Sequence, residues 1–229
     1  AHAREGQASK AEAWFNEMQR VRLTPDRLSF TTVLNGFARS RQADVAAQWL
    51  EKMLDAAVKA DVISFNSVIN AHVLVGSLDD ATACLERMIK SGVRPSVVTY
   101  SSLINACALN GSSSQALEWV ARLRAQGLTP NIITYNSVLK ACSRGGDFRT
   151  SAVVLDEMTA ELVKPDVVSY SCALSSCRQG QEDTARAKAA TAFFRRMTMD
   201  DLKPDMGVWL ALSRAVDPLA LKALMSEVE

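Results

Sequence analysis

The chain has 229 residues and a formal net charge of +1, so it lacks the strong positive charge of proteins that hold nucleic acids mainly by electrostatics. Apolar residues make up 48% of the sequence and aromatic residues only 6%, which favours packed helices over an aromatic-rich sheet core. No apolar run approaches the ~18 residues of a membrane-spanning helix, so we expect no membrane insertion.

One short segment recurs along the chain at a nearly constant distance. It is clearest as PNIITYNSVLKAC, which begins at Pro130. The first four steps between successive copies are 35 residues long, and the last step is 39 residues. A constant period of this length is typical of stacked repeat architectures, in which each unit packs only on its neighbours. The copies begin at Pro25, Ala60, Pro95, Pro130, Pro165 and Pro204.

Each unit is predicted to contain two helices. After Pro130, apolar residues recur at helical spacing as far as Cys142, and two glycines then interrupt the pattern. Asp147 begins a second apolar run, which ends before Pro165. Because proline cannot continue a helix interior, Pro165 marks the turn into the next unit. The sequence therefore predicts an all-α solenoid of helix-turn-helix units.

The repeats divide the chain into seven parts. Residues 1–26 are expected to be the second half of a truncated unit, so that any transit peptide lies outside this sequence. Residues 206–229 are expected to be a degenerate or truncated last unit, in which Pro218 interrupts the second helix. The fifth complete unit is longer, through an extended turn or a longer second helix within residues 181–192. The five complete units are expected at 27–61, 62–96, 97–131, 132–166 and 167–205.

Columns of equivalent residues predict how the helices pack. A small residue stands near the end of each first helix, where it allows neighbouring helices to approach closely. The first helices share an aromatic position, occupied by Phe30, Phe65, Tyr100, Tyr135, Tyr170 and Trp209. The second helices share a packing position, occupied by Trp14, Trp49, Cys84, Trp119, Val154 and Phe193.

Nothing in the sequence resembles a catalytic or metal site. The five cysteines form no C-x-x-C pair, and their odd number argues against a disulfide framework and fits a reducing compartment. Cys107, Cys142 and Cys177 occupy one place in successive units, which indicates a small buried packing position. No glycine-rich phosphate loop, nucleophile elbow or metal-ligand spacing is present. We therefore expect no enzyme activity, no metal and no cofactor.

Two polar columns fit neither a core nor a catalytic site. The closing column could consist simply of helix caps, because Asp, Asn and Ser are preferred there. The other column lies inside the first turn, where caps are no longer needed. The residue after the aromatic position is Thr31, Asn66, Ser101, Asn136 or Ser171. The residue that closes each complete unit is Asp61, Ser96, Asn131, Asp166 or Asp205.

The pattern P-D-x-V-[ST]-Y-N-x-L-[IL]-x-x-C, followed by a glycine and an A-x-x-x-x-x-x-M run, resembles the pentatricopeptide repeat (PPR) family of the plain 35-residue class. It covers nearly the whole chain, and the related tetratricopeptide family has a different period. The resemblance implies a right-handed superhelical solenoid of antiparallel helix-turn-helix repeats. The first helices of such a solenoid line a groove that binds single-stranded RNA, one base per repeat.

The family resemblance also implies a role for individual residues. The fifth and last residues of each unit, here called its reading pair, contact the Watson-Crick edge of one base. The second residue, which is apolar, packs against the face of the base, although a core position would also require an apolar residue. These second residues are Leu28, Ile63, Val98, Ile133 and Val168.

The family code converts the reading pairs into a base sequence. Thr31 with Asp61 implies G, Asn66 with Ser96 implies C, and Ser101 with Asn131 implies A. Asn136 with Asp166 implies U, and Ser171 with Asp205 implies G. The expected core site is therefore 5′-GCAUG-3′. The last unit has Gly207 and Leu210 at the corresponding places, so we expect it to contact no base.

Phosphate contacts are expected to be few, from Arg39, Lys140, Arg144 and Arg178 on or near the first helices. The resemblance implies RNA processing, stability or translation in a mitochondrion or chloroplast. The alternative is a structural role, in which the solenoid is a scaffold subunit of a large organellar ribonucleoprotein or other assembly and its groove holds protein or structural RNA.

Overall fold

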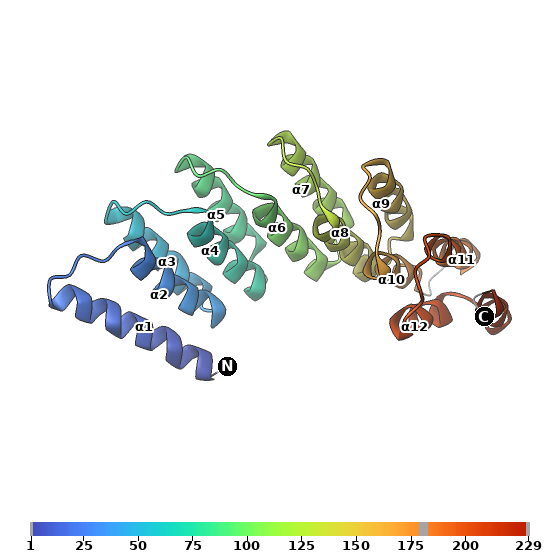
Figure 1. The fold of residues 1–229 in the computed structure, drawn as a ribbon, viewed down its shortest axis with the longest axis horizontal. Helices are drawn as coiled ribbons and strands as arrows, with labels where there is room; N and C mark the ends of the chain where they lie inside the picture. The colour runs from blue at the N-terminus through green and yellow to red at the C-terminus, as the bar shows by residue number, and fades with distance from the viewer. Residues whose placement is uncertain (1, 179–182, 228–229) are drawn as a thin grey trace. The chain divides into compact units, whose positions relative to one another are not determined.

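The computed structural model describes residues 2–178 and 183–227, and helices are the regular secondary structure of this part of the chain. Thirteen α-helices follow one another within it, and it contains no strand (Figure 1). The helices are α1 (His2–Arg20), α2 (Arg27–Arg39), α3 (Ala43–Asp55), α4 (Val62–Val75), α5 (Leu78–Lys90), α6 (Val97–Asn110), α7 (Ser113–Ala125), α8 (Ile132–Gly145), α9 (Phe148–Ala160), α10 (Val167–Ser175), α11 (Asp183–Met199), α12 (Met206–Ala215) and α13 (Pro218–Ser226).

The chain forms two compact units, Ala1–Ala106 and Cys107–Glu229, and α6 contributes to both. In the first unit, α2 packs on α3 and α4, and α4 packs on α5. In the second unit, α8 packs on α7, α9 and α10, and α10 packs on α11 and α12. Each unit is thus built from helix hairpins stacked through their first helices, as the sequence predicts for an all-α solenoid.

Polar side chains begin the first helices. The Asp61 carboxylate accepts a hydrogen bond from the Ser64 backbone N–H at 3.0 Å, and the Asp166 carboxylate accepts one from the Ser169 N–H at 2.8 Å. Such bonds satisfy backbone donors that have no partner within the helix. The closing residue of each predicted unit is therefore also the N-cap of the following helix, as at Asp61, Ser96, Asn131, Asp166 and Asp205.

Two glycines allow a close approach at the ends of two first helices. A Cβ atom at Gly145 would lie 2.4 Å from the carbonyl oxygen of Gly111, closer than a real Cβ contact allows. Gly111 also has a φ of 65°, in the left-handed region that favours glycine. The ends of α6 and α8 can therefore meet only because both positions lack a side chain.

The aromatic and cysteine columns form the core. Phe65, Tyr135 and Tyr170 are at most 1% exposed, and the Cys142 thiol is fully buried. Burial raises the pKa of Cys84 and of Cys142 to about 12, as expected for thiols that serve as small apolar side chains.

Two details of the sequence interpretation are wrong. Trp14 is 72% exposed, because it lies on a face of α1 that no helix of the described chain covers. Pro218 does not interrupt a helix but begins α13, with Asp217 as its N-cap. Proline suits this first position because its missing N–H would have had no partner within the helix.

The second helix of the fifth unit is longer than that of the fourth, and the interval from Ser175, the end of α10, to Asp183, the start of α11, is also longer than the interval between α8 and α9. α11 has 17 residues, whereas α9 has 13. Residues 181 and 182 lie outside the described part of the chain. A longer second helix was one of the two alternatives that the sequence left open.

Candidate functional site

A row of apolar side chains lies exposed at the starts of the first helices. Each member is the second residue of a predicted unit, and its exposed fraction lies between 54% and 73%. A core position, the alternative explanation for an apolar residue here, is therefore excluded. Exposed apolar side chains that recur at one place in successive repeats indicate a contact surface. The members are Leu28, Ile63, Val98, Ile133 and Val168.

The fifth residue of each predicted unit lies one turn further along the same helix. Thr31, Asn66, Asn136 and Ser171 are partly exposed, and Ser101 is 9% exposed. Their polar atoms are thus close enough to the surface to contact a ligand in four of the five units.

The two members of a reading pair come together in the second compact unit. Asn136 Nδ2 donates a hydrogen bond to Asp166 Oδ1 at 3.2 Å, although the residues are 30 positions apart. Asp166 caps α10, the first helix of the next repeat, so the contact joins α8 to the start of α10. Ser101 belongs to the first compact unit and Asn131 to the second.

Asp61 and Asp166 are held in the ionised form. Burial opposes ionisation of Asp61, but hydrogen bonds from Ser64 and the charge of Arg27 outweigh it, so the pKa of Asp61 lies below its ordinary value. Burial is likewise outweighed at Asp166 by hydrogen bonds from Ser169 and Asn136, and the pKa of this carboxyl is also lowered. Both carboxylates are therefore hydrogen-bond acceptors at neutral pH.

The sequence interpretation missed two features near the reading pairs. The Arg27 guanidinium lies 3.6 Å from Asp61 Oδ2 and is largely exposed. A second feature is a column of fully buried hydroxyls, one at the third position of each unit from the second to the fifth. The column was visible in the sequence as the Ser or Thr two residues before the polar one, but its contacts depend on neighbouring repeats. Its members are Ser64, Thr99, Thr134 and Ser169.

The four residues expected to contact phosphate are all exposed, and at least two of them already bond to the protein. Arg144 donates to the Leu109 carbonyl at 3.4 Å, and Arg178 donates to the Ser143 carbonyl at 3.1 Å. Both contacts reach back 35 residues and satisfy carbonyl groups near the end of the preceding first helix. Arg39 and Lys140 lie on α2 and α8. Both guanidinium groups keep their charge, but these contacts restrict where they can meet a ligand.

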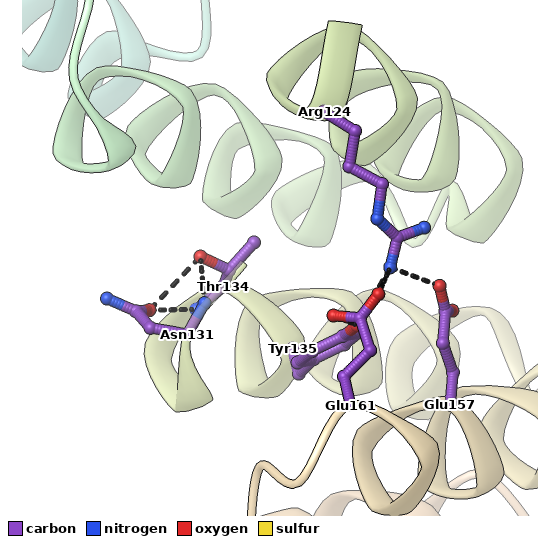
Figure 2. Close-up of polar contacts among 6 residues, drawn as sticks. All are labelled: Arg124, Asn131, Thr134, Tyr135, Glu157 and Glu161. Carbon is purple, nitrogen blue, oxygen red and sulfur yellow. Dashed lines mark hydrogen bonds and ion pairs between the residues drawn. The ribbon is translucent and has the colours of Figure 1, made fainter. Parts of the chain in front are cut away.

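An ion-pair cluster fixes α8 between its neighbours. Arg124 on α7 donates to the Tyr135 hydroxyl at 2.9 Å and to Glu161 at 2.7 Å, and it also pairs with Glu157 (Figure 2). The Tyr135 hydroxyl donates to Glu161 at 2.8 Å. Figure 2 also shows the Asn131 cap, which accepts from the Thr134 N–H at 3.0 Å at the start of the same helix. The cluster anchors the helix that carries Ile133 and Asn136.

The end of the chain lacks the pattern of the site. Gly207 stands at the second position of the last predicted unit, and Leu210 stands at its fifth position with 51% of its surface exposed. Neither residue offers a polar side chain to a base.

Among the described residues, no cluster of histidines, cysteines and carboxylates could hold a metal ion. None of the helices described is long and apolar enough to cross a membrane.

The fold resembles solved pentatricopeptide repeat structures. The crystal structure of the pentatricopeptide repeat protein PPR10 from maize is 22% identical, with a TM-score of 0.69, and the match covers 94% of this chain and 30% of that one. PPR10 in complex with an 18-nt psaJ RNA element is 23% identical, with a TM-score of 0.65, and the match covers 98% of this chain and 36% of that one. The chain therefore spans about a third of the length of PPR10.

A third structure is the PPR domain of Arabidopsis thaliana protein-only RNase P 1 in complex with tRNA, at 17% identity and a TM-score of 0.60. That match covers 85% of this chain and 93% of the domain. These likenesses confirm the all-α solenoid fold.

No curated protein matches the chain significantly. Family models do match most of it. The model described as a pentatricopeptide repeat domain matches residues 91–145 and 120–180, and the PPR repeat family model matches residues 60–109. The PPR repeat model matches residues 1–23 and 28–57. These matches confirm the resemblance seen in the sequence, and the chain belongs to the pentatricopeptide repeat family.

Proposed function

We propose that the chain binds single-stranded RNA sequence-specifically, one base per repeat, and acts in organellar RNA processing, stability or translation. The repeats run over 27–61, 62–96, 97–131, 132–166 and 167–205, flanked by partial repeats at 1–26 and 206–229. The observation that carries the proposal is the row of exposed apolar side chains, each followed one turn later by a polar side chain.

The chemistry of an RNA base fits this arrangement. An apolar side chain packs against the face of any base, while hydrogen-bonding groups distinguish the edges of different bases. Ile133, for example, is 64% exposed and precedes the partly exposed Asn136 on the same helix. Four of the five repeats can thus supply one packing contact and one polar contact to the same nucleotide.

Hydrogen bonds made by one member of each of two reading pairs support the assigned bases. The Thr31 hydroxyl donates to the Arg27 carbonyl at 2.8 Å, so it offers an acceptor outward, beside the second acceptor Asp61. Guanine presents two neighbouring donors, N1–H and the N2 amino group. Asn136 has a second amide hydrogen beside the acceptor Asp166, and uracil presents O4 next to N3–H.

The direct test is equilibrium binding of the purified chain to short RNAs. We expect UUGCAUGUU to bind at least about 30-fold more tightly than UUGUACGUU, because two bidentate contacts worth roughly 1–3 kcal/mol each are lost when C and U are exchanged. The two RNAs have the same composition, so non-specific attraction cannot separate them. Equal affinities would contradict the proposal.

Salt dependence gives a second readout of the same complex. Four phosphate contacts would give a slope of about −3 in a plot of log K against log salt, because each contributes roughly −0.7 on a single strand. We expect a slope close to this value, since Arg144 and Arg178 keep their charge while they donate to carbonyl groups. A role as a scaffold subunit would instead show no preference between the two RNAs.

A further inference from the structure

In each of three reading pairs, a buried hydroxyl from the next repeat contacts both members of the pair. Ser169 Oγ lies 2.6 Å from Asn136 Oδ1 and 2.9 Å from Asp166 Oδ1. Its side chain belongs to the repeat that follows Asn136, at the third residue of α10. A single hydroxyl thus contacts both side chains that are proposed to contact one base.

The same contact recurs in the first compact unit. Thr99 Oγ1 lies 2.7 Å from Asn66 Oδ1 and 3.2 Å from Ser96 Oγ. Ser64 Oγ lies 3.1 Å from Thr31 Oγ1 and 3.0 Å from Asp61 Oδ1. The recurrence in three repeats with different reading residues shows that the contact follows from the repeat geometry. We call Ser64, Thr99 and Ser169 the bridging hydroxyls.

A bridging hydroxyl restricts the orientation of its reading pair. Each is 0% exposed, so water cannot replace its partners. A hydroxyl carries one proton, so it donates to one member of the pair at a time while the other member stays within reach. At Asn136, the hydroxyl of Ser169 donates to Oδ1 while Nδ2 donates to Asp166. Rotating the Asn136 amide by about 180° would place its Oδ1 against the Asp166 carboxylate oxygen, and two acceptors repel each other. Asn136 therefore presents a donor, not an acceptor, towards the surface.

We propose that the bridging hydroxyls are positioning residues, which set the base preference of the preceding repeat by holding its reading pair in one arrangement. The inference rests on the proposed function, because it concerns how that site discriminates between bases. A bridging hydroxyl touches no base itself. Its removal should change the difference in binding affinity between bases, and it should have little effect on the packing of the apolar second residue against the base.

The chain contains a natural comparison. The sixth first helix has Val208 where the other repeats have Ser or Thr, and this side chain is fully buried. Asp205 still caps the helix by accepting from the Val208 N–H at 2.8 Å. Among the described residues, the Ser171 hydroxyl makes no hydrogen bond. The fifth repeat is therefore expected to discriminate less between bases than the second and fourth repeats.

The test removes one bridging hydroxyl and adds another. Thr99→Val removes only the hydroxyl, and we expect discrimination at the second base of GCAUG to fall about 3- to 10-fold, the usual net contribution of one hydrogen bond. Discrimination at the first and fourth bases should not change. Val208→Thr should increase discrimination at the fifth base by a similar factor. Competition among four RNAs that differ at one base measures each ratio.

Ser102→Ala is the matched control, because the Ser102 hydroxyl lies on the same helix as Thr99 and bonds to the Val98 carbonyl of that helix. It should leave every ratio unchanged. A merely structural role of Thr99 would weaken all four RNAs equally, and that result would overturn the inference. If Thr99→Val prevents folding, unchanged discrimination at the fifth base in Val208→Thr overturns it instead. If the wild type shows no base preference at all, the proposed function itself fails, and the positioning role with it.

Discussion

The exposed apolar row separates RNA binding from stability, and Val98→Ala tests this separation. Val98 is 64% exposed on α6, and Val153, on the second helix α9, is 60% exposed. Both are valines with similar burial, but only Val98 lies in the proposed site. Val153→Ala is therefore the matched control.

The expected effect follows from the exposed fraction of the side chain. Replacing Val by Ala removes two carbon groups worth about 0.8 kcal/mol each when fully covered. About two thirds of the Val98 side chain is free to be covered by a base, which amounts to roughly 1 kcal/mol of binding free energy, or about fivefold in Kd. The remaining third, about 0.5 kcal/mol, is the expected loss of unfolding free energy in both variants.

Fluorescence anisotropy with labelled UUGCAUGUU and urea denaturation measure the two quantities. We expect Val98→Ala to weaken binding about fivefold, whereas Val153→Ala leaves Kd unchanged, with the same small loss of stability in both. Equal Kd values for the two variants would refute the assignment of the apolar row to base packing.

Three further predictions concern the fold. Leu162 is 93% exposed and has a φ of 60°, so Leu162→Gly should raise the urea midpoint by relieving about 0.5–1 kcal/mol of backbone strain. Gly127 has a φ of 72°, so Gly127→Ala should lower the urea midpoint by a similar amount. Shifts of the same sign in the two variants would contradict this reasoning. The Cys142 thiol, with a pKa raised to about 12, should resist alkylation at pH 8 until the protein unfolds. Rapid labelling of Cys142 itself in the native chain, located by peptide mass spectrometry and distinguished from the partly exposed Cys172, would show that it is not buried. The folded-state pKa values of Asp61 and Asp166 are lowered, so their contribution to stability is present above the ordinary Asp pKa of 3.8 and is lost as pH falls through the folded values. Thermal unfolding followed by circular dichroism should therefore show a fall in the midpoint temperature below about pH 4. A constant midpoint temperature from about pH 5 to 3 would contradict this expectation.

Most of the fold follows from local sequence patterns. The period predicts helix pairs because apolar spacing, glycine turns and capping residues recur together, and Phe65, Tyr135 and Cys142 are buried as their columns indicate. Local patterns give a wrong prediction where a helix lacks the neighbours that the other repeats have. Trp14 continues a packing column on a helix with an uncovered face, and Pro218 is a helix start that resembles an interruption.

The candidate site was predictable only in part. The exposed second residues could not be distinguished from core positions by sequence, because an apolar side chain fits both. The sequence does not predict the proposed bridging role of Thr99 and Ser169, because a hydroxyl at the third helical position is also an ordinary partner of an N-cap. Their contacts to Asn66 and Asn136 join one repeat to the next over 33 residues, and the 35-residue period alone does not predict which side chains meet across that distance.

Exchanging the last residue of one repeat tests the base assignment most directly. Ser96 caps α6 through the Thr99 N–H, and Asp occupies the same capping position before α4 and α10, so Ser96→Asp should fold normally. The variant acquires the Asn-Asp pair of the fourth repeat in the second repeat. Competition between GCAUG and GUAUG RNAs measures the result. We predict that the preference moves from C towards U at the second base by about tenfold or more. An unchanged ratio would contradict the assignment of Asn66 and Ser96 as a base-reading pair.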